Sequence, residues 1–326
     1  MALVFAVTNG LHDAANAIAT LVATRAARPS AAVCLAAVGN IVGPLVLGKA
    51  VADTIAGLVT VPPSELIFVL GAALTGAVAW NLLTWWRGFP SSSGHALLGG
   101  LMGAAIAQGG VDQVNWGGFR GFRPTGVFGV MAVLALAPVL GFGAGFLADR
   151  AARRAVRRAT DRMRGPIRAG QWVMAGALAF GHGANDAQKA IGLVAVMLFA
   201  AGEIDKLAAP SWVALACGAA LTTGTALGGW PVVRTLGQRL VRLRPIDSLA
   251  SQASSATVLL AASLTGAPVS TTQVVASSVV GVGAGHRRWR HVHWPMVRNI
   301  LVAWLVTVPA AAAFAVIALL PWRWLT

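Results

Sequence analysis

The stretch Gly183-Ala184-Asn185-Asp186-Ala187-Gln188-Lys189 decides the fold of this chain, because it places an acid and a base inside an apolar run spanning residues 172–201. A run of that length can cross a bilayer. An Asp or Lys at the centre of a membrane helix costs about 2.5–3.5 kcal/mol, and membrane proteins that keep such a residue generally use it. The stretch therefore predicts a polar site buried at mid-membrane depth.

Two pairs of motifs predict that the chain is duplicated. Gly10-Leu11-His12-Asp13-Ala14-Ala15-Asn16 starts the frame Gly-x-x-Asp-Ala-x-x-Ala-Ile, which returns 173 positions later from Gly183. Pro90-Ser91-Ser92-Ser93-Gly94-His95 has its counterpart 178 positions later in Pro268-Val269-Ser270-Thr271-Thr272-Gln273. Two independent pairs at nearly the same spacing indicate two copies of one unit.

The composition is that of a membrane protein. The chain is 57% hydrophobic and only 11% charged, with a mean hydropathy of +0.72, whereas soluble domains carry about 25% charged residues. Its net charge of +15 does not indicate nucleic-acid binding, because the Arg residues lie in short loops between apolar runs. Cys34 and Cys217 fall inside apolar runs and predict no disulfide, and residues 1–7 lack the basic start of a cleavable signal.

We therefore predict an all-α polytopic membrane protein with about ten transmembrane or re-entrant segments in two inverted-topology repeats of five. The segments span residues 1–23, 31–47, 65–84, 91–107, 125–148, 172–199, 211–231, 248–265, 269–285 and 297–320. Residues 1–148 form the first repeat, 149–171 a basic cytoplasmic loop and 172–326 the second repeat. An odd number of spans in each repeat inverts the second copy, as in many secondary transporters.

The distribution of Arg predicts the orientation in the cell membrane. Basic loops alternate with nearly neutral loops along the chain, so all the basic loops lie on one side of the membrane. The positive-inside rule predicts that this side is cytoplasmic. Both termini are then expected outside. The loops assigned to the basic face hold Arg25 and Arg28, Arg87, the eight Arg of residues 149–168, Arg234 to Arg244, and Arg287 to Arg290.

Helical spacing places the polar residues of each motif on one face. Asn9, Asp13 and Asn16 are related as i, i+4 and i+7, and so are His182, Asp186 and Lys189. We assign Asn9, Asp13 and Asp186 to a coupling cation, because Na⁺ prefers oxygen ligands and protonation of the same Asp can serve an H⁺-coupled carrier. Gly10 and Gly183 are predicted to let each helix break beside a cavity.

The two Pro-Ser/Thr motifs read as helix starts capped by hydroxyl groups. A helix beginning inside the membrane points free N–H groups and a positive dipole end at the midplane, which favours an anion. We assign the anion to Asn16, Asn185, Lys189 and the two hydroxyl triplets, and regard these segments as re-entrant or broken helices. The triplets are Ser91, Ser92 and Ser93, and Ser270, Thr271 and Thr272.

Several of these residues also have an ordinary structural interpretation. Lys189 can equally form an ion pair with Asp186. His12, His95, His182 and Gln273 are accessory candidates, and a hydrogen-bonded histidine between helices is an equal alternative for His95. Membrane Ser and Thr often bond to their own backbone.

At these motifs the chain resembles the PiT family of inorganic phosphate transporters. The likeness is carried by Thr8–Ala17, Pro90–His95, Gly181–Lys189, Pro268–Gln273 and residues 227–237, and it extends over essentially the whole chain. It implies an inverted-repeat fold, symport of phosphate with H⁺ or Na⁺, and a homodimer in the lipid bilayer. Gly94 and Gln273 depart from a hydroxyl residue and a His common in related sequences, which argues against a titrating group in the second loop.

The sequence thus predicts a phosphate symporter that works by alternating access, with no enzymatic activity and no cofactor besides the coupling ion. Sulfate or a metal–phosphate complex remains an alternative cargo. An anion channel and an intramembrane hydrolase are the rival functions; the second lacks a His-Glu-x-x-His motif. Replacing Asp13 or Asp186 with Asn is expected to abolish coupled uptake and leave the fold intact.

Overall fold

The computed structural model describes residues 1–157, 161–227, 233, 240–241, 243–285 and 289–324, and these residues are mostly helical. The long helices are α1 (Ala2–Ala23), α2 (Pro29–Val46), α4 (Pro63–Trp86), α5 (Ser93–Gly109), α6 (Val127–Ala155), α7 (Arg164–Ala200), α8 (Ser211–Leu227), α10 (Pro245–Leu264), α11 (Thr271–Gly285) and α12 (Trp294–Trp324). Shorter elements are α3 (Ala50–Ala56), the 3₁₀ turns Val111–Gln113, Asp161–Met163 and Trp289–His291, and the strands β1 (Phe119–Arg120) and β2 (Arg123–Pro124).

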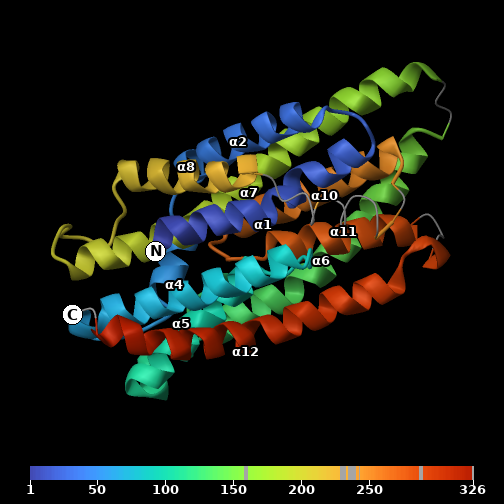
Figure 1. Cartoon of the computed structure of the whole chain (residues 1–326). Helices are drawn as coiled ribbons and strands as arrows, with labels where there is room; N and C mark the ends of the chain where they lie inside the picture. Colours follow the sequence, from blue (N-terminus) through green and yellow to red (C-terminus); the bar gives the residue numbers. More distant parts are fainter. Residues whose placement is uncertain (158–160, 228–232, 234–239, 242, 286–288, 325–326) are drawn as a thin grey trace.

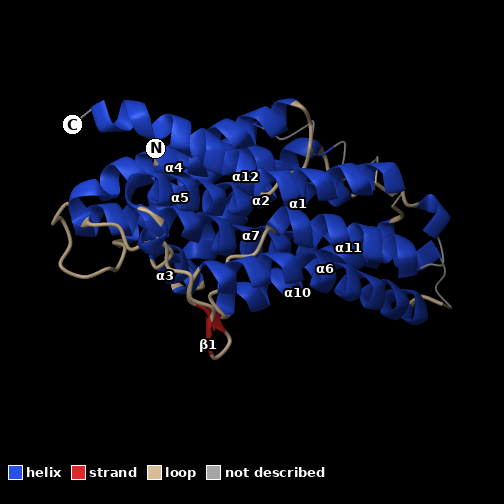
Figure 2. Cartoon of the chain, turned by 90° about the horizontal axis from the view of Figure 1, so that it is seen from below, coloured by secondary structure: helices blue, strands red, loops and turns tan. Residues whose placement is uncertain are grey.

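The helices form one elongated bundle, with both chain termini at the same end (Figure 1). The view from below shows helices throughout the bundle, with the small β1–β2 hairpin projecting from its side (Figure 2). In the described part of the chain, four helices are long and apolar enough to cross a membrane: α2, α4, α6 and α12. Each of the ten predicted apolar segments coincides with a helix, although residues 228–231 of the seventh lie outside the described residues.

Helix α3 was not predicted, because its sequence is short and carries Lys49 and Asp53 near its start. Its position depends on a distant residue. The Gln188 side chain on α7 accepts hydrogen bonds from the backbone N–H groups of Val51 (2.9 Å) and Ala52 (3.3 Å). These N–H groups belong to the first turn of the helix, which has no partners of its own. A contact 137 residues away in sequence therefore caps α3.

Two helical hairpins, α4–α5 and α10–α11, have their turns in the middle of the bundle. The turn between α4 and α5 reaches His12 and Asp13, halfway along α1, and the turn between α10 and α11 reaches Asp186, well inside α7. Each hairpin therefore ends at the depth of the buried acids and does not run past them. The basic segment predicted at residues 149–171 is largely helical, since α6 continues to Ala155 and α7 begins at Arg164.

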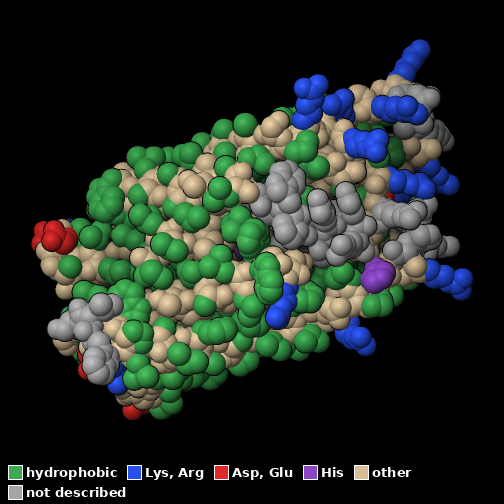
Figure 3. Space-filling view, viewed as in Figure 1, with side chains coloured by type: hydrophobic (Ala, Val, Ile, Leu, Met, Phe, Trp, Pro, Cys, Tyr) green, Lys and Arg blue, Asp and Glu red, His purple; other side chains and the backbone are tan. Residues whose placement is uncertain are grey.

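Basic and acidic side chains separate along the bundle. Figure 3 shows most Lys and Arg side chains gathered at one end, acidic side chains at the other, and an apolar flank between them. Arg87 was assigned to the basic loops, and this was wrong: it follows Thr84, which contacts His12 at mid-depth, so its turn lies near the site. Arg158, Arg234, Arg239, Arg242, Arg287 and Arg288 lie outside the described residues.

The prediction that Gly10 and Gly183 break their helices was also wrong, because α1 and α7 are continuous through both positions. The glycines serve close packing. A Cβ at Gly10 would lie 2.0 Å from the carbonyl oxygen of Leu221 on α8, and a Cβ at Gly183 would lie 2.5 Å from Cα of Asn40 on α2. Only glycine lets these helix backbones approach so closely, and the close crossings fix the positions of α1 and α7.

Candidate functional site

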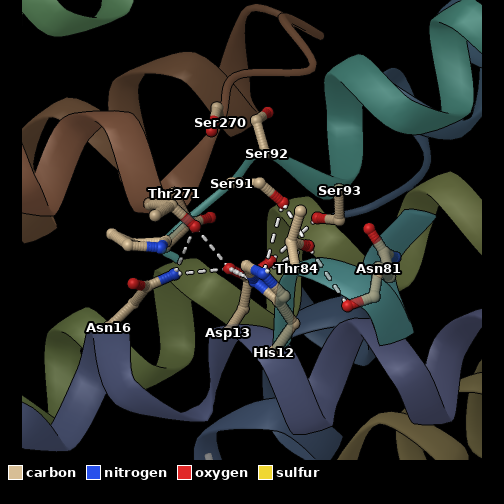
Figure 4. Close-up of polar contacts among 12 residues, drawn as sticks. His12, Asp13, Asn16, Asn81, Thr84, Ser91, Ser92, Ser93, Ser270 and Thr271 are labelled. Atoms are coloured by element: carbon tan, nitrogen blue, oxygen red, sulfur yellow. Dashed lines mark hydrogen bonds and ion pairs between the residues drawn. The ribbon is translucent and has the colours of Figure 1, made fainter. Parts of the chain in front are cut away.

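Asp13 is buried where the two hairpin turns meet. Its carboxylate accepts hydrogen bonds from Ser93 Oγ (2.8 Å) at the start of α5, from Asn16 Nδ2 (2.9 Å) on its own helix, and from Thr272 Oγ1 at the start of α11. Asn16 also donates to Thr272 Oγ1 at 3.1 Å. Figure 4 shows Asp13 and Asn16 rising from α1 between the α5 start and the α11 start. One carboxylate therefore connects both hairpins to α1.

Asp186 lies in a different environment. It accepts a hydrogen bond from Thr271 Oγ1 of α11 and forms an ion pair with Lys189, three residues along α7. His182 Nε2 lies 3.2 Å from the same carboxylate. The Lys189 ammonium also donates to the Val269 carbonyl at 2.9 Å, so it is fully buried with two partners. This geometry favours the structural ion-pair interpretation of Lys189.

The two acids converge. Single ligand atoms of Asp13, Asp186 and His182 all lie within 4.8 Å of one another, and all three residues are buried. Two carboxylates and an imidazole nitrogen at this spacing can hold a cation. With His12 and His182 neutral, two buried acids against one Lys leave an uncompensated negative charge, which suits the site to a further cation.

The remaining polar residues of the first motif continue along α1. The ring nitrogen Nε2 of His12 contacts Thr84 Oγ1 (3.3 Å) and Ser91 Oγ (3.2 Å), and these hydroxyl groups contact each other at 2.9 Å. His12 Nδ1 lies 3.6 Å from Asp13. The Asn9 amide is fully buried, and both its polar atoms lack a hydrogen-bond partner among the described residues.

The predicted helix starts are confirmed by their caps. Ser92 Oγ accepts a hydrogen bond from the backbone N–H of His95 (3.2 Å) and lies 2.7 Å from His95 Nδ1. Ser270 Oγ accepts from the backbone N–H of Gln273 at 3.3 Å. The two helix N-termini point into the same region as the acids, which is the arrangement that attracts an anion. Asn185 instead donates to the Ala267 carbonyl (3.0 Å) and Ser263 Oγ (3.3 Å) of the second hairpin.

Sequence reasoning missed three residues that hold this site. The amide oxygen Oδ1 of Asn40 on α2 accepts a hydrogen bond from His182 Nδ1 at 2.8 Å, and its Nδ2 donates to Thr225 Oγ1 at 2.8 Å. Thr84 contacts His12 and Ser91, and Gln188 caps α3. All three are buried polar residues inside apolar helices. A polar residue inside an apolar run could have been recognised from the sequence, but the sequence does not show which residue it contacts.

Known proteins resemble this chain in sequence and in fold. The sequence profile described as the phosphate transporter family matches residues 9–315. The chain is 40% identical over 314 residues to a probable low-affinity inorganic phosphate transporter of Rhizobium meliloti, covering 96% of this chain and 91% of that protein. A protein of Bacillus subtilis with the same description is 36% identical over 322 residues, covering 97% and 93%.

A solved structure has the same fold. It is described as the sodium-dependent phosphate transporter and superposes with a TM-score of 0.87 at 25% sequence identity, covering 100% of this chain and 98% of the other. The similar stretch noted at residues 227–237 lies outside the described residues, apart from Leu227 and Val233. The likeness in sequence and in fold therefore extends over both halves of the chain, and both motif pairs fall within it.

Proposed function

The chain belongs to the phosphate transporter family, and from this premise we propose that it carries inorganic phosphate across the cell membrane in symport with Na⁺ or H⁺ by alternating access. The observation that carries the proposal is the convergence of Asp13 and Asp186 at the point where two hairpin turns meet. Oxygen-rich groups for a cation and helix N-termini for an anion then share one buried place.

Asp13 is the primary cation site in this proposal. Among the described residues, the only basic group paired with its carboxylate is the His12 ring, whereas Asp186 has Lys189. Asn9 and Asn16 supply further oxygen atoms on the same face of α1. The solved protein of similar fold is described as sodium-dependent, which favours Na⁺; protonation of Asp13 would neutralise the same charge for H⁺ coupling.

The hydrogen bonds suggest how a cation is coupled to phosphate. In this structure the hydroxyl groups of Ser93, Thr271 and Thr272 donate hydrogen bonds to the two carboxylates. A cation that takes over a carboxylate releases such a donor, and the donor can then bind a phosphate oxygen beside the helix N-termini. Ser91, Ser92, Ser270 and Asn185 complete the phosphate ligands we propose. Each substrate therefore strengthens the binding of the other.

We propose that residues 1–148 and 172–326 are inverted repeats around the basic segment 149–171. Mirrored packing supports this: α1 packs against α8 as α2 packs against α7, and α12 packs against the first hairpin as α6 packs against the second. In such transporters one repeat moves against the other around a fixed central site. The hairpins would be re-entrant, entering from opposite faces of the membrane.

By the positive-inside rule, we propose that the basic end of the bundle lies in the cytoplasm and that both termini lie outside. Assembly as a homodimer is a further part of the proposal. Crosslinking of the protein in native membranes tests the dimer, and labelling of an engineered terminal thiol from each side of the membrane tests the orientation.

Uptake of radiolabelled phosphate into liposomes tests the function. We expect accumulation against a phosphate gradient when an inward Na⁺ or H⁺ gradient is imposed, and the gradient that drives it identifies the coupling ion. Excess sulfate should not compete, and adding or chelating Mg²⁺ shows whether the metal–phosphate complex is the cargo. Equilibration without accumulation would indicate a channel, and no phosphate movement under either gradient would refute the proposal.

A further inference from the structure

Helix α10 carries two polar faces that differ in their hydrogen bonding. On one face Ser254 Oγ lies 2.7 Å from Ser278 Oγ of α11, and Ser278 Oγ donates to the Ser251 carbonyl at 3.3 Å. These contacts join the two helices of the hairpin. On the other face, Ser248, Gln252 and Ser255 are fully buried, and among the described residues their side chains have no hydrogen-bond partner.

The α10 face that carries Ser248, Gln252 and Ser255 packs toward α7. Its polar residues form a line that extends away from the site. Ser263, on the same face, receives the hydrogen bond from Asn185. One turn further, Leu259 Cβ would lie 3.3 Å from a Cβ at Gly181 of α7. Ser255, Gln252 and Ser248 follow at the spacing of one helical face. The line begins at the candidate phosphate ligand Asn185 and runs to the start of α10.

The start of α10 belongs to the charged end of the bundle. Asp247 pairs there with Arg153 at the end of α6, and Arg153 also binds Asp149 at 2.9 Å. Helix α1 contributes Thr20, which is buried with an unpartnered hydroxyl, and then Thr24, which donates to Gln171 of α7 at 2.7 Å. Helices α1, α7 and α10 contact one another. Polar side chains of these three helices thus lie between the site and the basic end, and on the α10 face the apolar Leu259 separates Ser263 from Ser255.

The first hairpin lacks this feature. At the spacing of 178 residues that relates the two hairpin motifs, Ser248, Gln252 and Ser255 correspond to Leu70, Leu74 and Ala77 of α4. All three are completely buried and apolar. Among the described residues, the unpartnered polar side chains of α4 are Asn81 and Trp85, and both lie in its last turns, close to Thr84 and hence beside the site. The polar line is therefore specific to α10.

Buried polar groups without partners cost folding free energy, so a helix that holds three of them in a row needs a use for them. We propose that the α10 face carrying Ser248, Gln252 and Ser255 lines the aqueous route between the Asp13–Asp186 site and the basic end of the molecule. The route is closed in this structure. When α10 moves away from α7, the hydroxyl and amide groups hydrate and offer neutral donors to a passing oxyanion. That this oxyanion is phosphate rests on the function proposed above.

Thiol accessibility tests the route directly. In a Cys34→Ala, Cys217→Ala background, Ser255→Cys is compared with Thr257→Cys, two residues away. Thr257 is exposed on the outer side of α10 beside Leu136 and Leu140, where hydrocarbon surrounds it in a membrane. A sulfonate-bearing methanethiosulfonate is applied to each side of phosphatidylcholine vesicles. A third variant, Met163→Cys, marks the basic end.

We expect the buried Ser255→Cys to react at least ~10-fold faster than the exposed Thr257→Cys, from the side that Met163→Cys identifies, because the thiolate forms only in water. Phosphate should slow the reaction. Equal rates for the two variants, or reaction of Ser255→Cys only from the opposite side, would overturn the proposal.

A second measurement separates a route from a merely structural role. Gln252→Leu installs the residue type of the corresponding Leu74. We expect phosphate binding in detergent to change less than ~2-fold while the uptake rate falls at least ~10-fold, with Gln252→Asn restoring uptake. The melting temperature should not fall, because an unpartnered amide has been removed.

Unchanged uptake by Gln252→Leu would refute the route, and so would a lowered melting temperature that accounts for the loss of uptake. If the unmodified protein neither binds nor transports phosphate, the proposed function fails on its own. The thiol rates then still decide whether water reaches α10.

Discussion

Asp13 and Asp186 hold corresponding places in the two halves of the chain, yet only Asp186 has a fixed cation beside it. Lys189 neutralises Asp186, whereas Asp13 is held by the neutral donors Ser93, Asn16 and Thr272. The position that corresponds to Lys189 in the first motif is Asn16. The duplicated framework thus keeps two buried acids, and one substitution makes one of them a structural ion pair and leaves the other for a mobile cation.

The hairpins differ in a parallel way. Both turns end at the site with a capped helix start, but α4 seals its side with Leu70 and Leu74 where α10 presents Ser248 and Gln252. Two repeats with the same backbone arrangement can therefore differ in role: one helix presents polar side chains and its counterpart packs with apolar ones. The following experiments can break or sharpen this comparison, in order of decreasing effect.

The two acids should respond differently to neutralisation. Asp13→Asn keeps the shape of the side chain but loses the charge, and we expect gradient-driven phosphate uptake to fall at least ~100-fold with little change in melting temperature. Asp186→Asn should abolish uptake and also destabilise the protein by about 3–5 kcal/mol, because Lys189 is left buried and unpaired. For Asp186→Asn, this prediction differs from the sequence-based expectation that both variants fold normally.

Uptake assays and thermal melts of the purified variants measure both effects. The double variant Asp186→Asn, Lys189→Met is the control, and it should recover stability without recovering uptake. Equal melting temperatures for Asp13→Asn and Asp186→Asn would contradict the distinction between the two acids.

The matched glycines should be equally intolerant of a side chain. Gly10→Ala and Gly183→Ala each place a Cβ against the backbone of a neighbouring helix, and we expect a loss of about 1–3 kcal/mol or more in each case. Gly94→Ala is the control, since its Cβ would find its nearest neighbour, Lys189 Nζ, at 3.5 Å. Fluorescence-detected melting gives the comparison; a stable Gly10→Ala protein would show that the α1–α8 crossing can relax.

The Thr272 hydroxyl, which connects the second hairpin to Asp13 of α1, should affect the affinity for the coupling cation more than the free energy of unfolding. Thr272→Val removes the donor from the second hairpin to Asp13. We expect the apparent affinity for the coupling cation to rise about 10-fold, because the cation no longer displaces a hydrogen bond to a charged group, which contributes roughly 1.5–3 kcal/mol. Thr272→Ser keeps the hydroxyl and should behave normally. Phosphate uptake titrated with the coupling ion measures the shift, and an unchanged half-saturation would show that the cation does not displace this hydrogen bond.

The two caps should have the smallest effects. Ser92→Ala and Ser270→Ala each remove a side-chain acceptor from a helix start, and we expect a loss of about 0.5–2 kcal/mol in each. Ser92→Ala should cost more, because Ser92 also contacts the His95 ring. Denaturant or thermal melts in detergent compare the pair, with Ser92→Asn and Ser270→Asn as cap-preserving controls. A larger loss at Ser270 would reverse the expected order of the two hairpins.

The sequence by itself determined the membrane class, the positions of the long helices that the structure describes, and the identity of the paired acids. Apolar runs and the residues that interrupt them are local properties, and the cost of a buried charge makes Asp13 and Asp186 conspicuous without any knowledge of their neighbours. The hydroxyl-capped starts of α5 and α11 were predictable for the same reason, because a cap bonds within its own turn.

Only the tertiary structure decided which groups meet. The contact of Thr272 with Asp13 joins residues 259 positions apart, and Gln188 and Asn40 act on helices distant in sequence. Gly10 and Gly183 were misread as helix breaks, because the backbone that needs their missing side chains belongs to another helix. Spacing along the chain reveals which face of a helix is polar, but the partner of that face is fixed by packing, which depends on all the helices at once.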